Sequence, residues 1–476
     1  MPFTLQFSGL LPILRNAFTE IEIRKNGGAL PFSTLFDTPH THMLSNQIRQ
    51  ALLLAVGVLG LVAADTAYAQ DDPHVFRGAT IYTMSGDAID SGALVIQNGE
   101  ILDVGSAGAV DVPSGAVEVD ASGQVIMPGL IDTHSHIGGV SGGDGSSPLH
   151  PGVRTIDGIN VRNSGMMRAR AGGITTVNVL SGSGHLMSGQ TTHLKLRDGS
   201  TIDDLLLCYE DSDICGGMKM ANGTNPQRDS GPFPGTRAKS AAEARALFLE
   251  AEAYRDQLNS DDPPDRDLGM EGLVEVLNGE RIVHFHTHRH DDIMTALRLR
   301  DEFGFELVLH HVSEGWRVAD EIAEAGVPAS IITLDSPGGK HEAVNLYFRN
   351  GRVLDEAGVD VSYHTDDPIT DSRLFLRSPA MGVRAGMDRT AALESVTIAG
   401  ARQLGLDNRI GSLEPGKDAD FILLSGDPLS AYTRVNETWI EGMRVFDRSN
   451  PDDNAFFTGG YRIFDGTMHH VHDINE

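Results

Sequence analysis

The chain has 476 residues, enough for one large domain and a smaller one. Hydrophobic residues make up 40% and charged residues 22% of it, which is typical of a globular protein. The 37 Lys and Arg are outnumbered by 66 Asp and Glu, and the net charge of −29 repels the phosphates of nucleic acids and anionic lipids. We therefore expect a small-molecule substrate and no nucleic-acid partner.

A secretory signal is the first local feature along the chain. Arg49 supplies a positive charge, Ala51–Ala64 is apolar, and a small-residue cleavage pattern ends at Ala69. The apolar stretch is short for a bilayer, so we expect no stable membrane insertion, although a retained anchor is the alternative. A signal peptide works at the amino terminus, so we expect translation to start at Met43, after residues 1–42. The mature protein is then secreted or periplasmic.

Export also determines how the cysteines are interpreted. The only two are Cys208 and Cys215, seven positions apart, in a compartment where disulfides persist. A local disulfide and two buried thiols are both open. Two cysteines define neither a disulfide scaffold nor a cysteine-rich zinc site.

Two kinds of hydrophobic pattern follow the signal. Residues 75–125 predict short strands separated by turns rich in Gly, Ser and Asp. Between 128 and 409, apolar runs such as GGITTVNVL, RIVHFHTH and FELVLHHV alternate with amphipathic runs such as SAAEARALFLEAEAYRDQL and DDIMTALRLRDEFG. Alternation of strands and helices over about 280 residues favours a parallel (β/α)8 TIM barrel, an α/β fold.

The end of the chain is β-like again. We expect residues 409–447 to pair with the N-terminal strands and form a small β-sandwich domain from two separated segments. Residues after Asn450 appear irregular by pattern, and His469, His470 and His472 are expected to be a solvated tail. The predicted division is 1–42 upstream of the start, 43–69 signal peptide, 70–127 first part of the β-sandwich, 128–408 catalytic barrel, 409–450 second part of the β-sandwich and 451–476 C-terminal tail.

An H-x-H motif ends the strand that begins the barrel. The segment PGLIDTHSH runs from Pro128 to His136. Side chains alternate along a strand, so His134 and His136 point the same way, and two imidazoles on one face can bind one metal ion. A lone H-x-H is a weak signal, because two surface histidines produce the same pattern.

Three later strand ends carry further metal-ligand residue types. A barrel brings the carboxyl ends of its strands together at one rim, so these residues would converge with the H-x-H motif. We therefore predict a metal centre at this rim. The residues are His286, His288 and His290 after one apolar run, His310 and His311 after the next, and His364 and Asp366 after a third.

These motifs resemble the amidohydrolase superfamily. PGLIDTHSH is similar to its first-strand motif, and GLDNRIGSLEPGKDADFILLSGDP is similar to its return into the β-sandwich. Within the superfamily, GGITTVNVLSGSGHLMSGQ and HTHRHDDIMTALRLRDEFGFELVLHH resemble secreted imidazolonepropionase-like and dipeptidase-like members. The resemblance runs in order from about Val75 to Asp447. It implies a metal-dependent hydrolase of carbon–nitrogen bonds other than peptide bonds, with dipeptidase activity also open.

The resemblance also implies the metal ligands. They are His134, His136 and Asp366 for one ion and His286 and His311 for a second. Lys219, N-carboxylated by carbon dioxide, would bridge the two ions. If Lys219 instead binds substrate or an acidic neighbour, the site is mononuclear. His288 and His310 are the alternatives one alignment position away. Imidazole and carboxylate ligands suit zinc, although iron, manganese, nickel or cobalt fit too.

The implied mechanism gives the remaining polar residues their roles. Asp366 takes a proton from the attacking water and returns it to the leaving nitrogen. His288, Arg289 and His364 are assigned to substrate, and His185 is better explained as a structural histidine. The bond is that of an amide, a cyclic amide or a dipeptide. Ester or phosphotriester hydrolysis and a non-catalytic scaffold are the alternatives, and a homo-oligomer is open.

Overall fold

The computed structural model describes residues 72–140, 142–258, 260–332 and 341–459, which belong to one compact unit, Tyr68–Glu476. The signal peptide, residues 1–42 and the three C-terminal histidines lie outside the described residues. Among the helices that are described, none is long and apolar enough to span a membrane.

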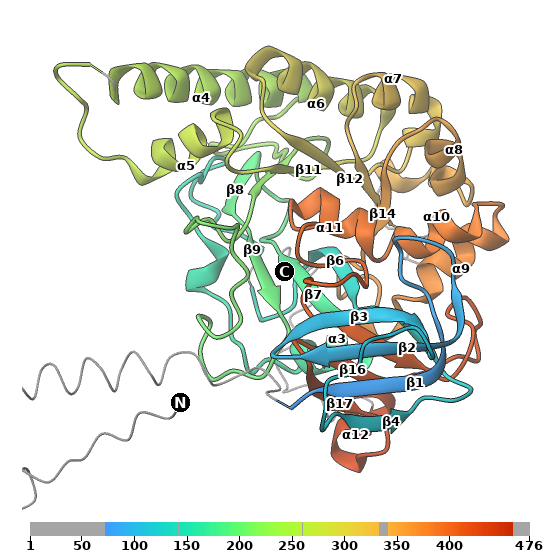
Figure 1. Cartoon of the computed structure of the whole chain (residues 1–476). Helices are drawn as coiled ribbons and strands as arrows, with labels where there is room; N and C mark the ends of the chain where they lie inside the picture. Colours follow the sequence, from blue (N-terminus) through green and yellow to red (C-terminus); the bar gives the residue numbers. More distant parts are fainter. Residues whose placement is uncertain (1–71, 141, 259, 333–340, 460–476) are drawn as a thin grey trace, which may run out of the picture. The chain divides into compact units, whose positions relative to one another are not determined.

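One eight-stranded sheet unites the two ends of the described chain (Figure 1). It contains β1 (His74–Ile81), β2 (Ile89–Gln97), β3 (Glu100–Ser106), β4 (Val117–Asp120), β5 (Val125–Pro128), β15 (Phe421–Leu424), β16 (Val435–Ile440) and β17 (Met443–Asp447). The antiparallel pairing of β5 with β15 joins the N-terminal strands to the C-terminal ones, with Ile126 opposite Leu423. Segments almost 300 residues apart therefore pair as the sequence predicts.

Aromatic residues from both ends of the chain pack against this sheet. Phe421 stacks on Trp439 with ring centroids 5.6 Å apart, and Phe76 meets Phe421 edge-on at 5.0 Å. All three are buried, and such pairs add stability beyond the area that they bury. They lie in a separate small core, which supports an N- and C-terminal subdomain. The two-layered sandwich itself stays a prediction, because these strands form one sheet.

The chain after Asn450 is a helix, α12 (Pro451–Thr458), so the prediction of an irregular tail is wrong for these residues. The Asn450 side chain accepts a hydrogen bond from the backbone N–H of Asp452, and Pro451 occupies the start of the helix. Asn as N-cap and Pro in the first turn are a helix-start signal.

The interior consists of two further sheets. A six-stranded sheet has the order β14 (Val361–Tyr363), β13 (Ala329–Ile331), β12 (Leu307–His311), β11 (Val283–Thr287), β10 (Met218–Ala221), β8 (Met187–Gln190). A three-stranded sheet has the order β6 (Leu130–Ser135), β7 (Ile174–Val179), β9 (Thr192–Lys195). Strands β10 to β14 are parallel neighbours, as alternation with helices requires.

Strand pairing does not close these two sheets into a barrel within the described residues. Strands β8 and β9, separated only by Thr191, run antiparallel to β10 and β7, which departs from an all-parallel barrel. No ladder joins β6 to β14 among these residues. Instead, the chain beyond β14 bonds to the end of β6, where the Asp366 N–H donates to the His134 carbonyl at 2.8 Å. The fold is thus a mixed α/β fold.

Helices follow the interior strands along the chain. They are α3 (Ser164–Ala171) after β6, α4 (Arg237–Leu258) and α5 (Leu268–Leu277) after β10, α6 (His290–Phe303) after β11, α7 (Ala319–Glu324) after β12, α8 (Asn350–Glu356) after β13, and α9 (Arg377–Arg384), α10 (Arg389–Glu394) and α11 (Ile398–Leu404) after β14. Short 3-10 turns, η1 (Thr155–Asp157), η2 (Gly315–Arg317), η3 (His341–Ala343) and η4 (Ser372–Leu374), lie in the connections. In Figure 1, α4, α6, α7 and α8 lie along the top of the view, beyond β11 and β12.

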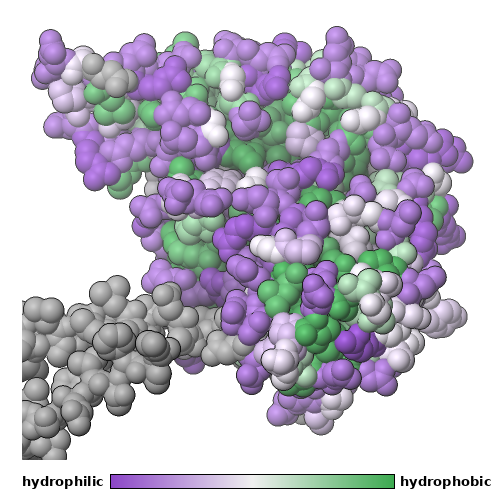
Figure 2. Space-filling view, in the orientation of Figure 1, coloured by the Kyte–Doolittle hydropathy of each residue, from purple (hydrophilic) through white to green (hydrophobic). Residues whose placement is uncertain are grey.

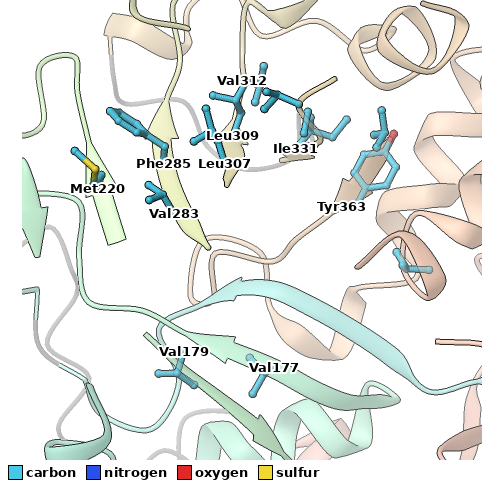
Figure 3. Close-up of a cluster of buried hydrophobic side chains, with 14 of the residues drawn as sticks. Val177, Val179, Met220, Val283, Phe285, Leu307, Leu309, Val312, Ile331 and Tyr363 are labelled. Atoms are coloured by element: carbon cyan, nitrogen blue, oxygen red, sulfur yellow. The ribbon is translucent and has the colours of Figure 1, made fainter. Parts of the chain in front are cut away.

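Each interior strand separates apolar from polar side chains. Val283 and Phe285 on β11, and Leu307 and Leu309 on β12, belong to the large hydrophobic core (Figure 3). The residues that alternate with them are His284 and His286 on β11, and Val308 and His310 on β12. Because strand side chains alternate, the apolar face packs against the helices and the polar face is left for the interior.

The surface shown in Figure 2 is mostly hydrophilic, with smaller hydrophobic areas between the polar side chains. This distribution fits a chain with net charge −29, whose acidic groups are spread along the sequence. Scattered apolar side chains at a surface are ordinary and need no partner.

A disulfide joins Cys208 to Cys215, which decides between the two alternatives left by the sequence. Both cysteines are half-buried. Between them the backbone turns, and the Tyr209 N–H donates to the Ile214 carbonyl at 3.0 Å. The bridge therefore closes a hydrogen-bonded loop at the end of the chain segment that follows β9.

A buried ion cluster connects β9 to the eight-stranded sheet. The Lys195 side chain is fully buried, and its Nζ pairs with Asp418, with Asp420 at 3.1 Å and with Glu441 at 3.2 Å. Burial alone would lower the pKa of Lys195, but the three carboxylates outweigh it and the net shift is upward. Arg197 also pairs with Glu441. This cluster holds the small subdomain against the interior sheets.

We predict that Lys195→Met destabilises the fold by about 3–5 kcal/mol, because it leaves buried carboxylates without their cation. Chemical unfolding of the purified protein measures this change. Lys239→Met is the matched control, since Lys239 is 62% exposed and pairs with Glu243 on the same helix. Equal stabilities of the two variants would contradict the prediction.

Candidate metal centre

The H-x-H motif lies at the end of β6, as the sequence predicts. His134 is buried and His136 is half-buried, and both Nε2 atoms face the Asp366 Oδ1, at 3.5 and 3.0 Å. The His136 Nδ1 lies 2.8 Å from the carbonyl oxygen of Leu180. A bond to that carbonyl requires a proton on Nδ1, which leaves the Nε2 lone pair free for a metal.

Asp366 and His311 have a backbone conformation that L-residues rarely adopt. Their φ angles are 51° and 69°. Such positions cost about 1–3 kcal/mol each and cluster at functional sites. At Asp366 the conformation aims the carboxylate at the two imidazoles of β6.

The two adjacent histidines of β12 both reach the interior. The His311 Nδ1 lies 3.1 Å from the His364 Nε2 and 3.9 Å from the Asp366 Oδ2. His310 is also buried, and its Nδ1 lies 3.1 Å from the Nδ1 of His134. Side chains of adjacent residues on a strand normally point to opposite faces of the sheet. The left-handed backbone at His311 interrupts this alternation, so His310 and His311 can both point inward.

Strands β10 and β11 contribute Lys219 and His286. Lys219 is fully buried, and its Nζ lies 3.3 Å from the His134 Nε2. The His286 ring lies 4.4 Å from that of His311 and 4.7 Å from that of His288, between centroids. The structure thus gathers all six predicted metal-ligand residues around one part of the interior; which of them bind metal stays a prediction.

Two groups of candidate ligand atoms have the spacing that a metal ion needs. One contains His134, His136 and Asp366, the other His134, His311 and His364, and the atoms in each lie within 4.8 Å of one another. His364, predicted to contact substrate, therefore lies among the candidate ligands. The His364 Nδ1 bonds to the Ser330 hydroxyl at 2.7 Å, which leaves its Nε2 toward His311.

The protonation of these imidazoles suits metal binding. Burial, with nearby cationic groups, lowers the pKa of His134 and His311 well below the ordinary value. Burial also lowers the pKa of His364 to about 3. Metal ions bind the neutral imidazole, so these side chains can bind without losing a proton at neutral pH. The donor set therefore fits a divalent ion.

Asp132 connects the two strands that carry the candidate ligands. Its fully buried carboxylate accepts hydrogen bonds from the backbone N–H and the hydroxyl of Thr365, and a longer one from the His134 N–H. Thr365 directly precedes Asp366. Asp132 belongs to the PGLIDTHSH motif, but no local pattern in the sequence reveals that its partner is Thr365.

The other residues assigned to substrate or structure lie in different surroundings. His288 is buried, and its Nδ1 bonds to the Ser313 hydroxyl at 2.7 Å. Arg289 is paired with Asp291 at the start of α6, so its described contacts are not with the cluster. The His185 ring contacts those of His150 and Phe233, a second group formed by loops.

Comparison with known proteins identifies the family. The amidohydrolase family profile matches residues 125–445. The chain belongs to the amidohydrolase family. This match covers every strand of the two interior sheets and nearly all of the C-terminal strands, and it confirms the resemblance drawn from the sequence.

Relatives extend over most of this amidohydrolase. An amidohydrolase of known structure from Thermotoga maritima MSB8 is 31% identical, with a TM-score of 0.73, and the match covers 79% of this chain and 100% of that one. An imidazolonepropionase from Deinococcus deserti is 26% identical over 78% of this chain and 96% of its own. The amidohydrolase tasK of Hapsidospora irregularis is 29% identical over 71% of this chain, which spans only 38% of that longer protein.

Membership in this family confirms the predicted enzyme class. Other relatives are named as deaminases, such as the 5-methylthioadenosine/S-adenosylhomocysteine deaminase of Symbiobacterium thermophilum, 24% identical over 74% of this chain and 85% of its own. Deaminases and imidazolonepropionases are hydrolases of carbon–nitrogen bonds other than peptide bonds. The amidohydrolase described here is an enzyme of that class.

We predict that Thr365→Val lowers the free energy of unfolding by about 1–3 kcal/mol, because the buried carboxylate of Asp132 loses a hydroxyl donor. Urea unfolding measures this change. Thr365→Ser keeps the hydroxyl and is the matched control. If the Val and Ser variants are equally stable, the hydroxyl of Thr365 does not support Asp132.

Proposed function

We propose that this amidohydrolase uses a divalent metal to hydrolyse a carbon–nitrogen bond in a small amide, cyclic amide or dipeptide. The observation that carries the proposal is the convergence of Asp366 with His134, His136 and His311. The name of one relative, imidazolonepropionase, favours a cyclic amide over a dipeptide.

His134, His136 and Asp366 would hold one ion, since their ligand atoms lie within 4.8 Å of one another. His286 and His311, whose ring centroids lie 4.4 Å apart, would hold a second. An N-carboxylated Lys219 would be shared by the two ions, and its Nζ lies 3.3 Å from the His134 Nε2. The His364 Nε2 lies close enough to serve as a further ligand. We propose zinc, which imidazole and carboxylate ligands suit. When bound, the ion supplies Lewis-acid chemistry at the substrate carbonyl.

The chain's own groups handle the proton. The Asp366 carboxylate accepts a proton from the attacking water and returns it to the leaving nitrogen. Its position is set by the left-handed backbone and by the bond from its N–H to the His134 carbonyl. His288, whose Nδ1 bonds to the Ser313 hydroxyl at 2.7 Å, would contact substrate.

We also infer that the two interior sheets are parts of a (β/α)8 barrel, with the eight-stranded sheet as its β-sandwich companion. The bonds from the segment after β14 to β6 support this closure. The likeness to the Thermotoga maritima amidohydrolase supports it as well. An experimental structure of this chain tests the inference through the hydrogen bonds at the β6–β14 seam.

Metal content is the direct test of the site. We predict about two ions per chain in the wild type, loss of most metal in His134→Ala, and loss of the second ion in Lys219→Ala, because a bridging carboxylate requires the lysine. Elemental analysis of the purified proteins measures this. Arg289→Ala is the control, since Arg289 pairs with Asp291 and should not change the metal content.

Other metal counts lead to different conclusions. About one ion, unchanged in Lys219→Ala, indicates a mononuclear site with Asp366 as the base and rejects the bridge. Retention of no metal under any loading condition contradicts the proposal and favours a non-catalytic scaffold.

Substrate class separates the remaining alternatives. The same ligand set also suits ester and phosphotriester hydrolysis. We predict that cyclic amides are cleaved faster than matched esters and that Asp366→Asn lowers kcat by about a hundredfold or more, since it removes the general base. Initial rates on paired amides, dipeptides, esters and phosphotriesters measure this. Faster cleavage of the esters would reject the carbon–nitrogen assignment.

We further propose that the protein is secreted or periplasmic. The disulfide between Cys208 and Cys215 supports this, because such bonds persist in oxidising compartments. Amino-terminal sequencing of the native mature protein tests the proposal, with Gln70 as the expected first residue.

A further inference from the structure

A file of buried imidazoles leads away from the candidate metal centre into the interior. The His134 Nδ1 lies 3.1 Å from the His310 Nδ1, and the His310 Nε2 lies 2.9 Å from the His284 Nδ1. His134, His310 and His284 come from β6, β12 and β11, and at most 1% of each is exposed.

A metal on the first ring would fix the tautomer of every ring in this file. The His134 Nε2 faces Asp366 at 3.5 Å, so a metal takes the lone pair there and the proton is left on Nδ1. That proton is donated to the His310 Nδ1, which must then be unprotonated. The proton of His310 is therefore on Nε2, from which it is donated to the His284 Nδ1. The two hydrogen bonds run in one direction, away from the metal.

The far end of the file is held by packing. A Cβ at Gly217 would clash with the His284 Cδ2, so the backbone of residue 217 lies directly against this ring. The His284 ring also meets that of His193 edge-on, with centroids 6.3 Å apart. Neither ring nitrogen of His193 has a hydrogen-bond partner among the described residues. The orientation of His284 thus depends on the tight fit at Gly217 and on His310.

We propose that His310 and His284 are positioning residues, which fix the tautomer and the ring orientation of the candidate metal ligand His134. This inference rests on the proposed metal-dependent function. His310 does not bind the metal; it holds the nitrogen of His134 that faces away from it. Partners that hold the second nitrogen of a metal-binding imidazole set its orientation and its basicity, and losing them weakens metal binding.

A matched pair of variants at His284 tests this proposal. His284→Leu removes the acceptor for the His310 Nε2–H, whereas His284→Asn keeps a carbonyl oxygen near the position of Nδ1. The probe is zinc, titrated against a competing chelator at fixed pH. We expect His284→Leu to weaken zinc binding by about tenfold to a hundredfold and His284→Asn to restore most of the affinity.

The outcomes separate this inference from the proposed function. Wild-type protein that binds no zinc overturns the proposed function and this inference with it. Tight zinc binding by the wild type and by both variants, or equal weakening in both, overturns the inference alone.

A spectroscopic measurement decides the case if His284→Leu does not fold. Long-range 1H–15N correlation of the histidine rings in the zinc-loaded wild type reports each tautomer. We expect the proton on Nδ1 of His134 and on Nε2 of His310 and His284. A proton on Nδ1 of His310 would overturn the proposal.

Discussion

The carboxylate of Asp132 holds the first interior strand against the segment that follows the last one. It accepts two hydrogen bonds from Thr365 and one from the backbone of His134, inside a fully buried environment. Burial raises the pKa of Asp132 to about 7, although the bonds from Thr365 oppose this shift. Since a buried carboxylate without donors is costly, the geometry around it is tightly determined. His134 and Asp366 flank this contact in sequence, so the contact sets the distance between two candidate ligands.

The two faces of the interior strands have different roles, one in stability and one in the candidate metal site. Their outer faces, with Val283, Phe285 and Leu309, bury enough apolar surface against the helices to stabilise the sheets. Their inner faces carry imidazoles and Lys219 in a region with little water. Low solvation keeps the imidazoles neutral, which is the form a metal binds. The same burial that would be unfavourable for charged histidines therefore prepares the site.

Much of this arrangement follows from the sequence, because it depends on local periodicity. The two-residue alternation of a strand predicts the H-x-H pair. The alternation of strands with helices predicts the strand ends that carry His286 and His311. The β-like patterns near both ends of the chain predict that these ends pair. Other features depend on contacts between distant residues. The hydrogen bond between Asp132 and Thr365 joins residues that are 233 positions apart in the chain, and no local sequence pattern predicts it.

The details of backbone geometry are equally hidden from the sequence. Neighbouring histidines on a strand should face opposite ways, and only the φ of 69° at His311 lets His310 and His311 both reach the interior. The sequence also does not predict that β8 and β9 run antiparallel to their neighbours, or that Cys208 and Cys215 form a disulfide. Each is decided by tertiary packing, which overrides a local preference.

The pairing of β5 with β15 has a consequence for how the protein is made. Strand β5 leaves the ribosome roughly 290 residues before its partner, which at about 5–20 residues per second is a delay on the order of 15 to 60 s. During that interval Val125–Pro128 presents an unpaired apolar edge, the kind that invites association with other chains.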